Sequence, residues 1–271
     1  MVNFLAHLFK EGYQYRSLNA YHSAISSVHE KVDGYEVGQH PLVSRLMKGA
    51  FNQRPPKPRY EVTWDVSKVL DHIESLGSSD SLSLQNLTWK LAMILALTRP
   101  SRSADLVMLD LRYRRYTPEG VVFQESGLAK QTRQGKPRAE FFFPAFPNNA
   151  RLCPIQTLRA YEQRTEPFRS GGDEEQMRLF LAVVRPHKPV CSSTLARWLR
   201  SLLDKAGIDT SIFKAHSTRS AATSAASNVG VTTADILRAA DWSSESVFTK
   251  FYYKPLRSGA FGEAVLSSNV K

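Results

Sequence analysis

The chain has 271 residues, of which 42% are hydrophobic and 23% charged, a composition typical of a folded globular protein. Lys and Arg outnumber Asp and Glu by 36 to 25, and the net charge of +11 favours a polyanionic partner, either nucleic acid or an anionic membrane surface. The longest apolar run, Leu91–Leu97, is far shorter than the roughly 20 residues of a membrane-spanning helix. Only two cysteines are present, Cys153 and Cys191, which excludes a disulfide framework and a Cys-based zinc site.

The N-terminal part of the chain is predicted to be a small helical domain over residues 1–54. Apolar residues recur at helical spacing in two segments, first at Leu18, Tyr21, Ile25 and Val28, then at Leu42, Val43 and Leu46. The pattern already runs at Phe4, so a missing first helix is an alternative that the sequence leaves open. Residues 54–59, RPPKPR, cannot continue a helix, and we expect a Pro-rich basic linker at 55–62 and a second domain at 63–271.

The second domain is predicted to be mainly helical with one small antiparallel sheet. An amphipathic helix runs from Val66 to about Gly77, and the next, 82–98, is apolar nearly all round and therefore buried, with Ser79 or Ser81 as its cap. A short helix follows at 101–109. Strands are predicted at 113–123, 127–143 and 179–184, with a polar turn at 131–136. Further helices are expected from 154 to 161, 192 to 205, 215 to 229, 232 to 240 and 244 to 253.

Basic residues gather around the predicted linker. The stretch 37–60 contains no Asp or Glu, which suits a segment that touches phosphates on both sides of a duplex. A solvated loop with incidental charge is the alternative. The helix at 195–205 offers a second basic surface, for which incidental charge is an equally good explanation. The residues predicted to contact DNA in these two regions are Arg45, Lys48, Arg54, Lys57, Arg59, Arg197 and Arg200.

Several short segments of the second domain carry the residues of a candidate active site. His216 and Arg219 lie three residues apart, on one face of a predicted helix. Arg102 and Asp105 follow the buried helix at the same spacing. Further along the chain come the segments ADW at 240–242 and FTKFYY at 248–253. In chain order the candidates are Arg102, Asp105, Lys130, His216, Arg219, Trp242 and Tyr252.

This ordered set resembles the tyrosine recombinase (phage integrase-like) family. The family pattern is an Arg in an R-x-x-E/D-L box, a Lys on a β-hairpin, an H-x-x-R box, a His or Trp, and then a Tyr. The resemblance implies a two-domain DNA clamp, with a helical core-binding domain and an α+β catalytic domain, that acts on double-stranded DNA without a metal or cofactor. The sequences WDV at 64–66 and FYYKP at 251–255 look most like eukaryotic transposon recombinases of the DIRS, Ngaro and Crypton type, which implies a nuclear protein.

The chemistry explains why these residue types are needed. A tyrosine phenol, here Tyr252, can hold the broken DNA strand as a 3′-phosphotyrosine, which a free 5′-hydroxyl later reverses. Two planar guanidiniums of fixed charge, Arg102 and Arg219, suit the negative charge on the phosphate in the transition state. Asp105 is expected to hold Arg102 or His216 by a hydrogen bond.

Three further side chains are expected either to transfer a proton or to contact the phosphate. Lys130 is the candidate general acid for the departing 5′-oxygen. His216 is expected to assist proton transfer or to orient the phosphate, and the indole N–H of Trp242 can donate to a phosphate oxygen. Arg133 and Lys136 compete with Lys130 for its role and are otherwise predicted to contact DNA.

Three assignments keep an alternative. His216 and Trp242 could be ordinary core residues, although a dual role is common for indoles. Tyr253 competes with Tyr252 as the nucleophile, and the spacing from Trp242 slightly favours an even earlier position, Phe251, which indicates a small insertion in this chain. If neither tyrosine reaches the phosphate, the protein is catalytically inactive.

The tail carries a small apolar cluster, Phe261, Val265 and Leu266. The resemblance implies that this segment docks on a neighbouring subunit and closes a cyclic homotetramer around two duplexes, with packing in cis as the alternative. The implied function is site-specific strand exchange for integration or excision of a mobile element. A type IB topoisomerase and a non-catalytic DNA-binding protein are the competitors, and membrane binding is disfavoured because no strongly amphipathic basic helix appears.

Overall fold

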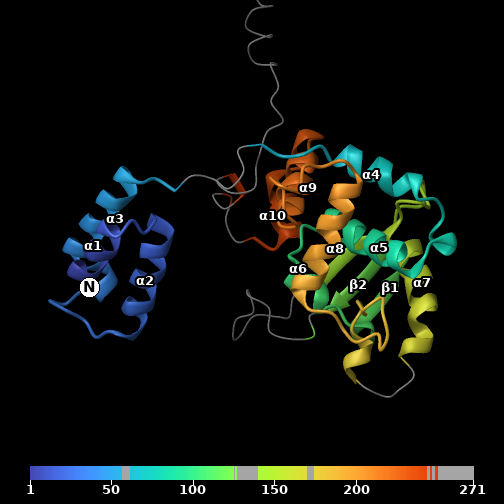
Figure 1. Cartoon of the computed structure of the whole chain (residues 1–271), viewed down its shortest axis with the longest axis horizontal. Helices are drawn as coiled ribbons and strands as arrows, with labels where there is room; N and C mark the ends of the chain where they lie inside the picture. Colours follow the sequence, from blue (N-terminus) through green and yellow to red (C-terminus); the bar gives the residue numbers. More distant parts are fainter. Residues whose placement is uncertain are drawn as a thin grey trace, which may run out of the picture. The chain divides into compact units, whose positions relative to one another are not determined.

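A computed structural model describes residues 1–56, 62–124, 126, 140–169, 174–242, 245 and 248–249. Contacts between Cα atoms divide the chain into two units, Met1–Arg59 and Tyr60–Lys271 (Figure 1). The fold is mainly α with one small antiparallel sheet, as the sequence predicts. No helix within the described ranges is long and apolar enough to cross a membrane.

The first unit is a small helical bundle. Helices α1 (Val2–Lys10), α2 (Tyr15–Val28) and α3 (Pro41–Gln53) contact one another, and the short 3-10 helix η1 (Val37–Gln39) lies between the last two in the sequence. Pro41 occupies the first turn of α3, where its missing N–H costs no hydrogen bond. The helices share one apolar cluster, made by Leu5, Leu8, Leu18, Val43, Met47 and Ala50.

The second unit is built around α5 (Leu84–Thr98). This helix is apolar nearly all round, and its middle residues from Leu91 to Ala96 are almost completely buried. It contacts α6, α7, α8, α9 and the sheet. The helices around it are α4 (Val66–Ser75), α6 (Ser103–Val107), α7 (Pro154–Thr165), α8 (Ser192–Lys205), α9 (Ser217–Asn228) and α10 (Thr233–Ala240), with 3-10 helices η2 (Ser79–Ser81), η3 (Leu111–Tyr113), η4 (Glu166–Phe168) and η5 (Glu174–Met177).

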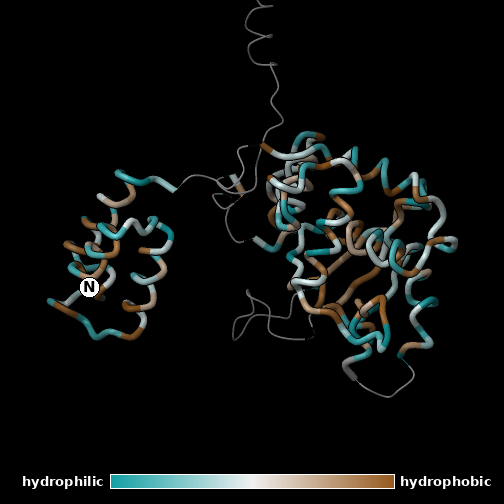
Figure 2. The backbone as a smooth tube through the Cα atoms, in the orientation of Figure 1, coloured by the Kyte–Doolittle hydropathy of each residue, from teal (hydrophilic) through white to brown (hydrophobic). Residues whose placement is uncertain are grey.

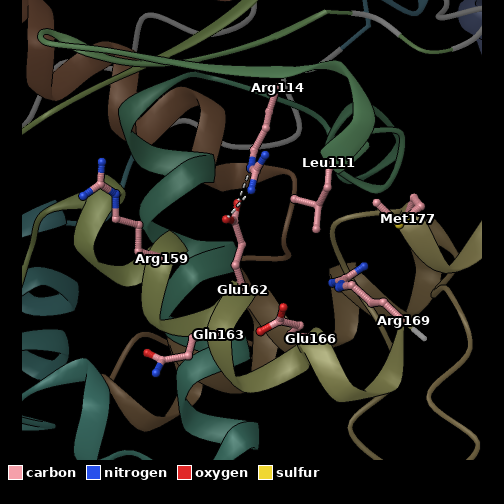
Figure 3. Close-up of a pocket in the computed structure, with 8 residues that line it drawn as sticks. All are labelled: Leu111, Arg114, Arg159, Glu162, Gln163, Glu166, Arg169 and Met177. Carbon is pink, nitrogen blue, oxygen red and sulfur yellow. Dashed lines mark hydrogen bonds and ion pairs between the residues drawn. The ribbon is translucent and has the colours of Figure 1, made fainter.

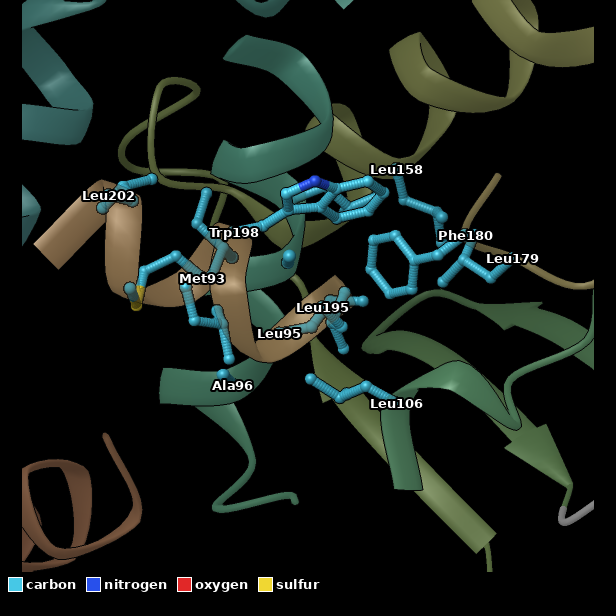
Figure 4. Packing of buried hydrophobic residues seen from close by; sticks show 14 of the residues in the cluster. Met93, Leu95, Ala96, Leu106, Leu158, Leu179, Phe180, Leu195, Trp198 and Leu202 are labelled. Atoms are coloured by element: carbon cyan, nitrogen blue, oxygen red, sulfur yellow. The ribbon is translucent and has the colours of Figure 1, made fainter. Parts of the chain in front are cut away.

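Helix α8 closes the core against α5. Its apolar stripe presents Leu195, Trp198 and Leu202 to Met93 and Ala96 of α5, as Figure 4 shows. Leu106, Leu158, Leu179 and Phe180 complete this layer (Figure 4). Figure 2 shows the same division along the backbone, with hydrophobic strands inside the unit and hydrophilic stretches on its outer helices. The core therefore joins the segments that carry the Arg102 box and the His216 box.

The sheet has three antiparallel strands in the order β1-β2-β3, namely β1 (Arg114–Thr117), β2 (Gly120–Gln124) and β3 (Glu140–Pro144). The central strand β2 is buried from Gly120 to Phe123. Strand β3 alternates, with Phe141 and Phe143 buried between exposed neighbours. Gly120 is required where it stands, because a Cβ there would collide with the carbonyl oxygen of Phe143.

Several element predictions need correction. The single strand predicted at 113–123 is a hairpin, because the segment Pro118–Glu119 turns the chain between β1 and β2. The strand predicted at 179–184 is absent from the described sheet, where this segment forms only an isolated bridge, Leu181 with Pro189. The cap of α5 is Ser83, whose Oγ accepts from the Asn86 N–H at 3.3 Å, instead of Ser79 or Ser81.

Candidate active site

Arg102 stands at the start of α6, immediately after the buried helix α5 has ended. Pro100 stops α5 from continuing, and the Asp105 carboxylate accepts a hydrogen bond from the Arg102 backbone N–H at 2.7 Å. The same carboxylate lies 3.7 Å from the Arg102 guanidinium. The whole Arg102 side chain is 27% exposed. Asp105 thus holds both the backbone and the side chain of Arg102, and this side chain remains partly exposed.

The His216 box forms the start of α9. His216 is the exposed N-cap of this helix, and Arg219 in its first turn is 1% exposed. The Arg219 Nε–H donates to the carbonyl oxygen of Pro100 at 2.8 Å, and Nη2 donates to that of Ala240 at 3.3 Å. Arg219 therefore connects the segment before Arg102 with the end of α10, across 119 and 21 residues of sequence.

Trp242 completes this cluster. Its indole ring lies with its centroid 5.0 Å from the Arg219 guanidinium carbon, a cation–π contact. The residue before it, Asp241, adopts a left-handed conformation (φ 51°) that Asp tolerates and that ends α10. Trp242 also stacks on Phe248 and packs with Ile236. The structure thus brings together three of the predicted segments, those of Arg102, of His216 with Arg219, and of Trp242.

A third arginine lies beside this cluster, and sequence reasoning assigned it no role. Arg99 is 8% exposed, donates from Nη2 to the Glu140 carbonyl oxygen at 3.3 Å, and stacks over the Phe141 ring at 4.1 Å. Burial lowers the pKa of its guanidinium, while the carboxylates of Asp241 and Asp105 raise it. The sequence offered one signal for a role of Arg99, because this arginine directly follows a helix that is apolar on nearly every side.

Some predicted site residues lie outside the described residues. These are the candidate general acid and its competitors, both candidate nucleophiles, two linker cations and the apolar tail cluster, namely Lys130, Arg133, Lys136, Tyr252, Tyr253, Lys57, Arg59, Phe261, Val265 and Leu266. The assignments to them stay predictions.

The other predicted DNA contacts fall into two groups. Arg45 and Lys48 are exposed on α3, and Arg197 and Arg200 are exposed on α8, with Arg197 donating to Thr194 at 3.3 Å. Arg54 instead works within the first unit, where its guanidinium donates to the carbonyl oxygens of Phe9 and Tyr13 and stacks over the Phe9 ring at 4.0 Å.

A pocket of about 620 Å³ lies elsewhere in the second unit, between η3, α7 and the segment that follows it. Arg114 forms a bidentate ion pair with Glu162 at 2.6 and 2.7 Å, as Figure 3 shows. The Tyr116 phenol donates to the same carboxylate at 3.2 Å. Burial first, and then the charge of Glu162, raise the pKa of Tyr116 to about 12. None of the predicted catalytic residues that the structure describes, Arg102, His216, Arg219 and Trp242, lines this pocket.

The part of the chain that the structure describes holds no group of three or more His, Cys, Asp or Glu side chains arranged to bind a metal ion. The cluster itself offers the guanidiniums of Arg102 and Arg219, the imidazole of the exposed residue His216 and the indole of Trp242. Such a set suits the recognition of a phosphate group.

Comparison with solved structures identifies the fold. No protein-family model matches the sequence, and no curated protein is similar to it in sequence. The XerH site-specific recombinase, in a post-cleavage complex with palindromic difH substrate, is similar with a TM-score of 0.63 and 14% identity over 100% of this chain and 71% of that chain. The XerA recombinase is similar with a TM-score of 0.54 and 16% identity, over 99% of this chain and 90% of that chain. The Tn1549 transposon integrase, in complex with circular intermediate DNA, is similar with a TM-score of 0.56 and 14% identity. This match covers 98% of this chain and 83% of that chain.

These similarities show that the mainly helical chain with its small antiparallel sheet has a tyrosine recombinase fold. At such low identity they concern the fold alone, and the DIRS, Ngaro and Crypton resemblance stays a prediction.

Proposed function

We propose that this chain is a site-specific DNA recombinase that cuts and rejoins DNA through a 3′-phosphotyrosyl intermediate. The observation that carries the proposal is the cluster around Arg219, which joins the Arg102 segment, the His216 box and Trp242 in one place. The solved structures with this fold include recombinases caught on their DNA, before and after cleavage. A recombinase-like fold and a cluster of side chains suited to a phosphate give stronger support together than either gives alone.

The residues then take complementary roles. Arg102, partly exposed and held by Asp105, binds a non-bridging oxygen of the scissile phosphate. Arg219 supplies the second positive charge from a buried position. His216 is exposed and can exchange a proton. Tyr252 is the proposed nucleophile and Lys130 the proposed general acid.

The wider assignments follow from the resemblance. The first unit would act as the core-binding domain, and each unit would contact DNA through its own basic side chains. The tail would dock on a neighbouring subunit in a homotetramer, and the reaction would integrate or excise a mobile element in the nucleus.

A non-catalytic DNA-binding protein is the second candidate. One observation favours it, because the Arg219 guanidinium is 1% exposed and already donates to two carbonyl oxygens. A side chain used in this way can serve the fold alone. Both candidates predict salt-sensitive DNA binding, so only a covalent reaction separates them.

The deciding experiment is a covalent-adduct assay on supercoiled plasmid and on nicked duplexes carrying candidate element termini. Wild type is compared with Tyr252→Phe and Tyr253→Phe, and Tyr35→Phe, an exposed tyrosine of the first unit, is the control. We expect an adduct that survives denaturation in wild type and Tyr35→Phe and is lost in Tyr252→Phe. Loss only in Tyr253→Phe would move the nucleophile by one residue. Tight binding with no adduct on any of these DNAs would favour the non-catalytic candidate.

A further inference from the structure

A buried hydrogen bond ties the beginning of the second unit to the His216 box. The indole Nε1–H of Trp64 donates to the Ser217 Oγ at 2.8 Å, between side chains 153 residues apart in the sequence. Trp64 is 5% exposed and Ser217 is 1% exposed. A hydrogen bond that is buried at both ends is costly to break, because each polar group would lose its partner without gaining water.

Ser217 passes this restraint to the backbone of the box. Its Oγ donates in turn to the Lys214 carbonyl oxygen at 2.7 Å, and its backbone N–H donates to the same oxygen at 2.8 Å. Ser217 is the first residue of α9, directly after His216 and two residues before Arg219. The position of its side chain therefore fixes where the chain enters α9 after His216 and in which direction the first turn of α9 runs.

Trp64 is itself held firmly. It belongs to the large apolar core of the second unit, and the next residue, Asp65, caps α4 by accepting from the Ser67 N–H at 2.9 Å. The first turn of α9 is thus fastened from three segments, by Trp64 before α4, by Pro100 after α5 and by Ala240 at the end of α10.

We infer that Trp64 is a positioning residue for the His216–Arg219 box, acting through Ser217. The inference rests on the proposed function, because it assigns Trp64 a part in the reaction of that same site. Trp64 lies too deep to touch DNA itself, so its contribution is the placement of His216 and Arg219. Small displacements of catalytic groups lower rates strongly, even when the altered residue is distant from the reacting atoms.

The test removes the hydrogen bond with little change of shape. Trp64→Phe keeps an aromatic ring but loses the N–H, and Ser217→Ala removes the acceptor. Trp89→Phe is the matched control, because Trp89 packs on the same core while its Nε1 has no hydrogen-bond partner among the described residues. Three quantities are measured, namely DNA affinity, the single-turnover rate of adduct formation, and amide hydrogen exchange over 214–222 in the free protein.

We expect Trp64→Phe and Ser217→Ala each to lower the adduct rate by about tenfold or more, with DNA affinity within about twofold of wild type. Ser217→Ala also loses the hydrogen bond to the Lys214 carbonyl oxygen and should be the slower single variant. The double variant should be no slower than Ser217→Ala, because the Trp64–Ser217 hydrogen bond is already lost there. Exchange over 214–222 should accelerate in both variants. Trp89→Phe should match wild type in every measurement.

Three results would overturn the inference. The first is equal behaviour of Trp64→Phe and Trp89→Phe, the second is faster exchange with an unchanged adduct rate, and the third is a lower rate with unchanged exchange. A wild type that forms no adduct on any DNA would instead sink the proposed function, and with it the catalytic part of the inference. The exchange measurement uses the free protein and would still decide whether Trp64 holds the start of α9.

Discussion

At the scale of single residues, the two arginines of the site differ in how the fold uses them. Arg102 is partly exposed and is held by one ion pair with Asp105, which is a weak restraint. Arg219 is buried, donates to two backbone carbonyl oxygens and stacks on Trp242. A substitution of Arg102 should therefore affect the reaction with little effect on the free energy of unfolding. A substitution of Arg219 should affect both.

Arg102→Ala should lower adduct formation by about 10²–10³-fold and change the free energy of unfolding by less than about 1 kcal/mol. Arg219→Ala should lower adduct formation by at least as much and also destabilise the second unit by about 2–5 kcal/mol, because two buried carbonyls lose their donor. Adduct assays and urea unfolding check both variants. An Arg102→Ala protein with full activity would remove Arg102 from the site.

Tyr116 should make stability depend on pH in the alkaline range. Its raised pKa, about 12 in the folded protein, means that folding favours the neutral phenol. This contribution is complete below the ordinary tyrosine pKa of about 10 and is lost as the pH rises through about 12. The free energies of unfolding of wild type and Tyr116→Phe, measured with urea, should therefore differ by a constant amount up to about pH 10. Above that pH the free energy of unfolding of wild type should fall relative to that of the variant. Parallel curves up to pH 12 would contradict this.

At the scale of elements, α5 organises the second unit. The sequence predicted this helix well, because a run that is apolar on every side can only be buried. It predicted the strands poorly, since Pro118 and Glu119 turn the chain within an apparently continuous strand. The order of the boxes was visible from their spacing, whereas the contacts of Arg99 and Trp64 were not. Those contacts join residues that are far apart in the sequence, and only the packing of helices brings them together.

Leu91→Ala in α5 should destabilise the second unit by about 2–5 kcal/mol, because Leu91 is fully buried and the cavity would collapse only in part. Ile212→Ala, at an isoleucine of the same unit that is 55% exposed, should change the stability of this unit by less than about 0.5 kcal/mol. Tryptophan fluorescence during urea unfolding measures this directly, since all four tryptophans lie in the second unit. Equal midpoints for Leu91→Ala and wild type would show that α5 is not the centre of the core.

At the scale of the whole molecule, the net charge of +11 should dominate DNA affinity. Arg45 and Lys48 are exposed on α3, opposite its buried residues, and are suited to contact phosphates. The double change Arg45→Ala with Lys48→Ala should weaken binding to all sequences and reduce the slope of log affinity against log salt by about 2, or about 0.9 for each lost phosphate contact.

Lys31→Ala is the control for this charge effect, because Lys31 pairs with Glu36 at 3.5 Å in the same unit. Its salt slope should match that of wild type. An unchanged slope for the double variant would mean that Arg45 and Lys48 do not contact DNA phosphates.

We propose that the chain keeps the cleaved DNA strand bound as a 3′-phosphotyrosine, so that the phosphodiester can form again without an energy source. The most direct measurement uses a nicked duplex labelled in turn on either side of the cleavage point. We predict that the protein retains the fragment carrying the 3′-phosphate, and that the released strand has a 5′-hydroxyl that a kinase can phosphorylate without prior dephosphorylation. Cleavage that leaves a 5′-phosphate and no protein-bound strand would contradict the account, because it would show hydrolysis in place of transfer to tyrosine.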